Sequence, residues 1–231
     1  MCGFVGAIAR AGRQPGLSDR GLDVWCDAVA HRGPDGAASW RGGQVALGHR
    51  RLAIRDLSEA GAQPMHAPQG RGVLVYNGEL YNDAELRAEL GPYAAGFGGF
   101  ATACDAETVL FAMMCWGEAA VSRLRGIFAL AWIDNRERHA LLARDPLGVK
   151  PLYWAGFGGE LTFASEVAAL LKHPAARAEP DLAMVSAYLT TVRRELGDRT
   201  MFKGVFSVLP GETLRVDLDD AALRPVLVSR W

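Results

Sequence analysis

The residues Met1-Cys2-Gly3-Phe4-Val5-Gly6 open the chain and place a cysteine directly before an apolar strand. Initiator methionine is normally trimmed when a small residue follows it, so we expect Cys2 to acquire a free α-amine beside its thiol. A nucleophile and a base would then sit on one residue. The amine suits that task because its unperturbed pKa is about 7.7–8.0. The ordinary alternative is a small buried hydrophobic cysteine.

The composition fits one large globular domain, and we expect residues 1–231 to form it. The chain is 50% hydrophobic and 22% charged, which is typical of globular proteins. A net charge of −1 gives no field that would attract nucleic acid or an anionic membrane. The longest apolar runs, such as residues 127–133, suit buried strands and are too short to span a bilayer.

The cysteines indicate a reducing compartment and no metal. Their positions, Cys2, Cys26, Cys104 and Cys115, contain no CxxC pair or zinc spacing, so we expect no metal ligand set and no cofactor. No basic leader precedes the first apolar run. We therefore expect a cytoplasmic protein with reduced thiols, in which Cys26 and Cys115 are core residues.

The hydrophobic patterns alternate between short strands and amphipathic helices and predict an α+β fold with antiparallel sheets. The Asn135–Arg138 and Gly156–Gly159 segments are typical hairpin turns. Ser18, Ser165 and Asp181 are candidate helix N-caps. We expect strands over residues 4–9, 38–41, 45–49, 73–76, 127–134, 140–143, 152–155, 161–164, 205–209 and 213–217, and helices over 18–30, 83–90, 105–116, 167–172 and 181–189.

Four short polar segments look shaped for chemistry, although each also has an ordinary structural explanation. Residues 31–36 (HRGPDG) could be a surface turn, and residues 48–54 (GHRRLAI) a strand end with solvated charges. Residues 76–82 (YNGELYN) contain an Asn-Gly pair, which favours a hairpin corner with positive φ. In residues 104–107 (CDAE), Asp105 could be a simple helix cap.

Taken together with Met1-Cys2-Gly3, and in this order and spacing, these segments resemble the glutamine amidotransferase domain of class II, the N-terminal-cysteine type. The match is nearest to the N-terminal half of asparagine synthetase B, a branch to which HRGPDG points. The resemblance continues through residues 61–65, 144–153, 163–166 and 210–212, so it covers essentially the whole chain. It implies the four-layer αββα sandwich of the N-terminal nucleophile (Ntn) hydrolases, which periodicity alone does not supply.

The resemblance also implies a mechanism on matching residues. Cys2 would attack the side-chain amide of glutamine and form a thioester, while its own α-amine relays the proton. The Asn77 side chain and the Gly78 N–H would form the oxyanion hole. The products would be ammonia and, after hydrolysis of the thioester, glutamate.

The same resemblance assigns the binding of the amino acid. Arg51, and not Arg50, would clamp the α-carboxylate, because the family arginine directly precedes the Leu of its Arg-Leu-x-Ile run. Asp105 would hold the α-ammonium with help from Glu79, and Leu52 and Ile54 would line the pocket. Cys104 is a departure, since the family usually has Ser or Thr there. The Arg144–Tyr153 motif has no clear role in hydrolysis, so we expect it to be structural or to contact a second domain.

Relatives of this type continue into an ATP-using synthetase domain with a Ser-Gly-Gly-x-Asp-Ser loop, which these residues do not contain. We expect ATP and Mg²⁺ only in such a domain or partner subunit, which would use the ammonia to amidate a carboxylate; a homodimer is also compatible. Two alternatives stay open: a catalytically silent domain that binds glutamine or docks a partner, and another Ntn amidase acting on an acylated substrate. The intact set Cys2, Arg51, Asn77, Gly78 and Asp105 argues against the first. Arg51 with Asp105 argues against the second, because together they fit a zwitterionic amino acid.

Overall fold

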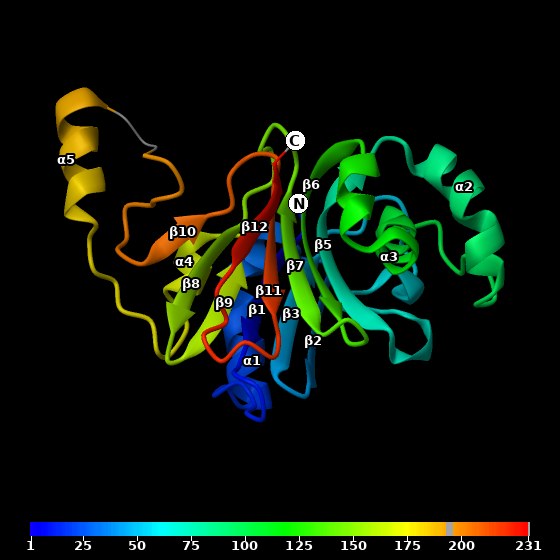
Figure 1. The fold of residues 1–231 in the computed structure, drawn as a ribbon, viewed down its shortest axis with the longest axis horizontal. Helices are drawn as coiled ribbons and strands as arrows, with labels where there is room; N and C mark the ends of the chain where they lie inside the picture. Colours follow the sequence, from blue (N-terminus) through cyan, green and yellow to red (C-terminus); the bar gives the residue numbers. More distant parts are fainter. Residues whose placement is uncertain (193–195, 231) are drawn as a thin grey trace.

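Two six-stranded antiparallel sheets stack face to face in the computed structural model, which describes residues 1–192 and 196–230 (Figure 1). The first sheet has the strand order β10-β8-β9-β1-β3-β2 and the second β12-β11-β7-β6-β5-β4. The first contains β1 (Gly3–Ile8), β2 (Gly36–Gly42), β3 (Val45–Arg51), β8 (Tyr153–Phe157), β9 (Glu160–Ala164) and β10 (Val205–Ser207). The second contains β4 (Met65–His66), β5 (Gly72–Leu80), β6 (Gly126–Asp134), β7 (His139–Arg144), β11 (Glu212–Asp217) and β12 (Val226–Arg230).

One hydrophobic core lies between the sheets because strands of both sheets direct alternate apolar side chains into it. Phe4 and Ile8 of β1 pack in one cluster with Val73 and Val75 of β5. Every residue of β1 is buried, since this strand lies between β9 and β3 and carries only apolar residues and glycine. The N-terminal strand is therefore an interior strand of the sandwich.

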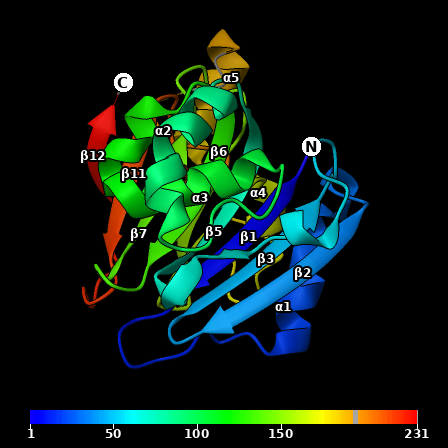
Figure 2. The same ribbon diagram turned by 90° about the vertical axis from the view of Figure 1, so that its right-hand side faces the viewer.

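Helices cover the two outer faces and complete four layers (Figure 2). α1 (Asp19–Cys26) and α4 (Val167–Leu170) cover the first sheet, where Leu22 and Trp25 are buried. α2 (Asp83–Ala95) and α3 (Asp105–Trp116) cover the second sheet. The αββα sandwich expected from the resemblance is confirmed.

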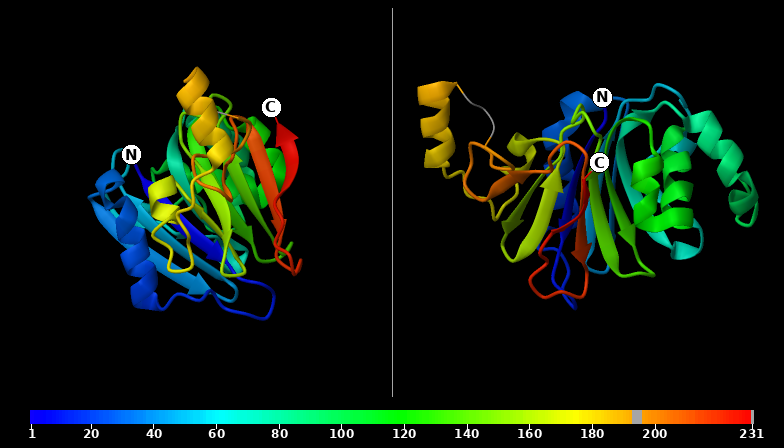
Figure 3. Two further views of the ribbon diagram at one scale, coloured as in Figure 1. Left: turned by 90° about the vertical axis from the view of Figure 1, so that its left-hand side faces the viewer. Right: turned by 45° about the horizontal axis from the view of Figure 1, so that its top comes forward.

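α5 (Leu182–Thr191) stands away from the sandwich (Figures 1 and 3). Asp181 caps it as expected, accepting hydrogen bonds from the N–H groups of Ala183 and Met184. Met184 is its only buried residue, whereas Leu182 and Leu189 are about three-quarters exposed. Among the described helices, none is long and apolar enough to cross a membrane.

Three sequence-based expectations about local structure are wrong. Asn77 and Gly78 form no hairpin corner: they lie inside β5, opposite Ala129 and Phe128 of β6. Ser165 does not cap a helix, because its hydroxyl instead accepts the Phe4 N–H at 3.1 Å, across the start of β1. The helix expected to reach residue 30 ends at Cys26 and continues as a 3-10 helix, η1 (Asp27–Arg32).

Candidate active site

The residue that carries the candidate nucleophile is fixed through its backbone. Cys2 directly precedes β1, and its carbonyl oxygen accepts a hydrogen bond from Arg32 Nε at 3.0 Å. Arg32 is itself held by Glu166, whose Oε1 lies 2.8 Å from Nη1. Gly33 follows Arg32 and presses on the backbone of Arg50, where a Cβ atom would collide with the carbonyl group. The 31–36 turn thus anchors the start of β1.

The Cys2 thiol lies against the loop that follows β3. Leu52 N–H donates to Sγ at 3.4 Å, and Sγ lies 3.7 Å from the Leu52 carbonyl oxygen. Burial raises the pKa of the thiol, opposed by the Leu52 N–H and by the positive charges of the N-terminal amine and Arg51. The resting group is consequently a thiol, which needs a neighbouring base before it attacks.

The N-terminal amine is suited to act as that base. Burial lowers the pKa of the Met1 amine; the Cys2 thiol and Asp35 oppose this effect, and the cations Arg32 and Lys150 add to it. A lowered pKa keeps more of the amine neutral, and therefore able to accept a proton, near pH 7. Met1 and Cys2 border the same cavity, so an amine on Cys2 would lie beside these cations too.

Asn77 borders this cavity and carries an unused hydrogen-bond donor. The side chain is 1% exposed, and its Nδ2 is buried without a hydrogen-bond partner among the described residues. Leaving a buried donor unsatisfied costs about 1–3 kcal/mol, so the arrangement points to an acceptor supplied by a ligand. At Gly78 a Cβ would lie 2.6 Å from the Ile127 carbonyl oxygen and from the Tyr76 ring, and only glycine fits.

The cavity is also lined by a carboxylate, that of Asp105. Asp105 starts α3, and its Oδ2 accepts Leu80 N–H at 2.9 Å and Tyr76 hydroxyl at 3.4 Å. Burial raises its pKa, opposed chiefly by the Leu80 N–H and by Arg55. Arg55 Nη1 lies 4.0 Å from Asp105 Oδ2 and Arg55 Nη2 lies 3.1 Å from Asp83 Oδ2. Arg55 thus lies beside the Asp105 carboxylate, where it would compete with the ammonium group of a bound ligand.

Arg51 and Arg50 point to opposite sides of β3, as neighbouring strand residues must. Arg51 borders the cavity, and its guanidinium donates to the carbonyl oxygens of Ser58, at 2.6 Å, and Asp56. It therefore holds the loop over residues 52–62 in place. Arg50 instead lies 3.3 Å from Asp27 on the outer face.

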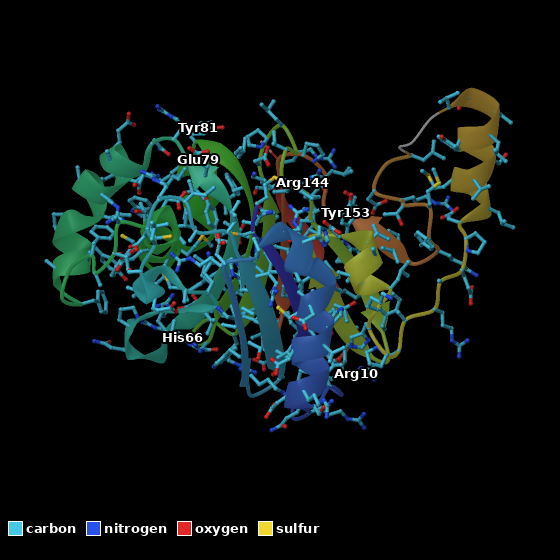
Figure 4. All side chains as sticks on the ribbon, turned by 180° about the vertical axis from the view of Figure 1, so that it is seen from behind. Arg10, His66, Glu79, Tyr81, Arg144 and Tyr153 are labelled. Carbon is cyan, nitrogen blue, oxygen red and sulfur yellow. The ribbon has the colours of Figure 1, made fainter. Side chains whose placement is uncertain are left out.

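One cavity of about 110 Å³ brings all the residues predicted for the site together: Cys2, Arg51, Leu52, Ile54, Asn77, Gly78, Glu79 and Asp105. Glu79 lies near the end of β5, close to Tyr81 (Figure 4). The sequence assigned no site role to the remaining lining residues, Met1, Ala53, Arg55, Asp56, Gly61, Gln63, Tyr76, Cys104 and Lys150. Arg32 lies in the 31–36 segment and Lys150 in the 144–153 motif. Nothing else in the sequence indicated that they border or support the site.

The 144–153 motif builds the link between the two sheets. The Asp145 carboxylate accepts the N–H groups of Phe128, Leu147, Val149 and Lys150 at 2.9–3.2 Å. Arg144 Nε donates to the Lys150 carbonyl oxygen at 2.8 Å, and Arg144 and Tyr153 lie on the side of the molecule that faces α5 (Figure 4). The expected structural role is thus visible, and it delivers Lys150 to the cavity.

The arrangement can perform covalent chemistry on a polar carbonyl compound. It offers a thiol, a neighbouring amine, an unused amide donor, and opposite charges on the walls. Among residues 1–192 and 196–230, no group of three or more His, Cys, Asp or Glu side chains could hold a metal ion.

Comparisons with known proteins agree with this chemistry. The model of the glutamine amidotransferase domain family matches residues 1–226. The chain is 35% identical to "Asparagine synthetase [glutamine-hydrolyzing] 3" of Bacillus subtilis over 222 residues, covering 95% of this chain and 35% of that protein. It is also 35% identical to "Amidase chry2" of Gibberella zeae over 224 residues, covering 93% and 32%. The chain spans about a third of the length of these curated relatives.

Solved structures share the fold at low sequence identity. The glutamine phosphoribosylpyrophosphate amidotransferase of B. subtilis, complexed with ADP and GMP, superposes with a TM-score of 0.67 at 19% identity. The match covers 99% of this chain and 49% of that one. At this identity the likeness supports the architecture alone.

Proposed function

Since the chain belongs to the glutamine amidotransferase family, we propose that it hydrolyses the side-chain amide of glutamine to glutamate and ammonia through a thioester on Cys2. The observation that carries this proposal is the buried Nδ2 of Asn77, which has no hydrogen-bond partner among the described residues, on a side chain that borders the same cavity as Cys2. A donor kept without a partner is useful where negative charge develops on a substrate oxygen.

In the proposed reaction, the α-amine of Cys2, free once Met1 is removed, accepts the thiol proton while Sγ forms a bond to the amide carbon. The carbonyl oxygen becomes an oxyanion that Asn77 Nδ2 and the Gly78 N–H stabilise. Collapse of this intermediate breaks the C–N bond, and the ammonium group returns its proton to the leaving ammonia. Water then hydrolyses the thioester, releasing glutamate and restoring the thiol.

The charges on the walls favour a free amino acid as substrate. Asp105 would bind the α-ammonium, and Arg51 would bind the α-carboxylate from the loop that it stabilises. The ammonium has to compete with Arg55, which lies 4.0 Å from the same carboxylate oxygen. We expect Arg55 to turn toward Asp83, with which it already pairs at 3.1 Å.

The ammonia would serve a synthetase domain or subunit that activates a carboxylate with ATP and Mg²⁺. Support comes from the name of the B. subtilis relative, an asparagine synthetase that hydrolyses glutamine. It also comes from length, because this chain spans about a third of such relatives. The four unpaired cysteines suit a reducing compartment such as the cytoplasm.

The test combines intact-mass spectrometry with an ammonia-release assay. The purified protein should have lost Met1, and a glutamine analogue with an electrophilic side chain should add one mass to Cys2. Cys104 also borders the cavity, but burial raises its pKa to about 11, so it should stay unlabelled. The Cys2→Ala variant should release no ammonia and bind glutamine normally.

Other outcomes would support the two alternatives. Glutamine binding without ammonia release, with Met1 retained, would indicate a silent binding domain. Release of ammonia from acylated amides in preference to glutamine would indicate a different amidase.

A further inference from the structure

Lys150 is a largely buried residue whose charge the proposed mechanism does not use. Only 8% of the residue is exposed, yet it borders the cavity that contains Met1, Cys2 and Glu79. In the described part of the chain, its ammonium makes no hydrogen bond within 3.5 Å and no ion pair within 4.0 Å. Burial lowers the pKa of this ammonium, and without a direct partner its charge acts on the other groups that border the cavity.

The backbone around Lys150 is built to hold it there. Its N–H donates to Asp145 Oδ2 at 2.9 Å, and its carbonyl oxygen accepts Arg144 Nε at 2.8 Å. These bonds fix the strand-to-strand link on both sides of the side chain. Arg32 brings a second cation, whose Nε binds the Cys2 carbonyl oxygen at 3.0 Å. The start of the chain thus lies near two positive charges.

We propose that Lys150 is a positioning residue for the proton transfer, whose positive charge favours the neutral α-amine and the thiolate of Cys2. This inference rests on the proposed function of Cys2. A nearby cation disfavours an ammonium and favours a thiolate, so it lowers the pKa of both groups. The interaction is mutual: Cys2 and Glu79 support the charged form of Lys150, while burial and Arg32 lower its pKa.

Other charges face the same groups and set the background for the effect. Asp35 favours the charged amine, and Asp105 opposes the thiolate while Arg51 supports it. These groups are unchanged in a Lys150 variant. A difference between variants at position 150 therefore reports the charge of that side chain.

The test compares Lys150→Met, which removes the charge, with Lys150→Arg, which keeps it. The acidic limb of the kcat/KM profile for glutamine should move up by about one pH unit in Lys150→Met, because the amine then stays protonated to higher pH. Activity below the limb should fall about tenfold and recover at high pH. Lys150→Arg should keep the wild-type limb, and so should the surface control Lys203→Met.

A second readout does not depend on glutamine hydrolysis. The pH at which iodoacetamide alkylates Cys2 half-maximally, followed by peptide mass spectrometry, should also rise by about one unit in Lys150→Met only. Equal loss of activity at every pH, without a shift of either midpoint, would overturn the role of Lys150. Shifted alkylation in a protein whose wild type releases no ammonia would support Lys150 and refute the proposed function instead.

Discussion

Replacing Asn77 with alanine should lower the catalytic activity of the protein without lowering its thermal stability. The change removes a side-chain donor of β5 beside the cavity, and a single donor to an oxyanion is worth about 10²–10³ in rate, or roughly 2.7–4 kcal/mol. Because the interaction forms mainly in the transition state, kcat should fall by that factor while KM for glutamine changes little.

The stability of the same variant should not follow its activity. Nδ2 is buried without a partner in the described structure, so its removal relieves a penalty of about 1–3 kcal/mol and offsets the lost packing. For a chain of this length, 1 kcal/mol corresponds to roughly 2–4 °C in Tm. We expect the Tm of Asn77→Ala to remain within a few degrees of wild type or to rise.

The assay is steady-state ammonia release by both proteins, paired with thermal unfolding followed by circular dichroism. Asn77→Asp serves as a matched control, because it keeps the size of the side chain but replaces the donor by a carboxylate. A fall in kcat of less than tenfold, or a large fall in Tm that accounts for the lost activity, would refute the assignment of Asn77.

Three further changes test other parts of the site. Arg51→Lys should raise KM for glutamine about tenfold, because lysine cannot donate both to the loop and to a carboxylate; an unchanged KM in the ammonia assay would contradict this. Arg55→Gln should lower KM severalfold, since the competitor for Asp105 disappears; a higher KM would show that Arg55 helps binding. Ser165→Ala should cost about 1–3 kcal/mol in urea unfolding, because the buried Phe4 N–H loses its acceptor, and stability equal to wild type would exclude that role.

The sequence predicted the strands and hairpins well because most of them depend on local patterns. The hairpin of β6 and β7 follows from two apolar runs around a polar turn, and the Asp181 cap follows from a single side chain. The stacking of two sheets between helices was predicted from the family resemblance. The match to the family model confirms that resemblance. Local patterns carry no information on which face of a sheet meets which helix.

Two of the failures involve contacts between residues far apart in the chain. Asn77-Gly78 has the local preference of a turn, but nine paired positions with β6 hold it extended. The Ser165 hydroxyl is used by Phe4, 161 residues away. Likewise, Lys150 and Arg55 are far apart in the sequence, and only the folded chain brings them to the same cavity.

The burial of β1 has a consequence for the motion of the residues around the candidate nucleophile. Terminal residues usually fray and exchange their amide hydrogens rapidly with solvent. Here the terminal segment enters the middle of a sheet, with neighbours on both edges. The β1 amides should thus be among the slowest to exchange with deuterium. Cys2 directly precedes this strand, so we expect its backbone to be about as rigid as the interior of the sheet.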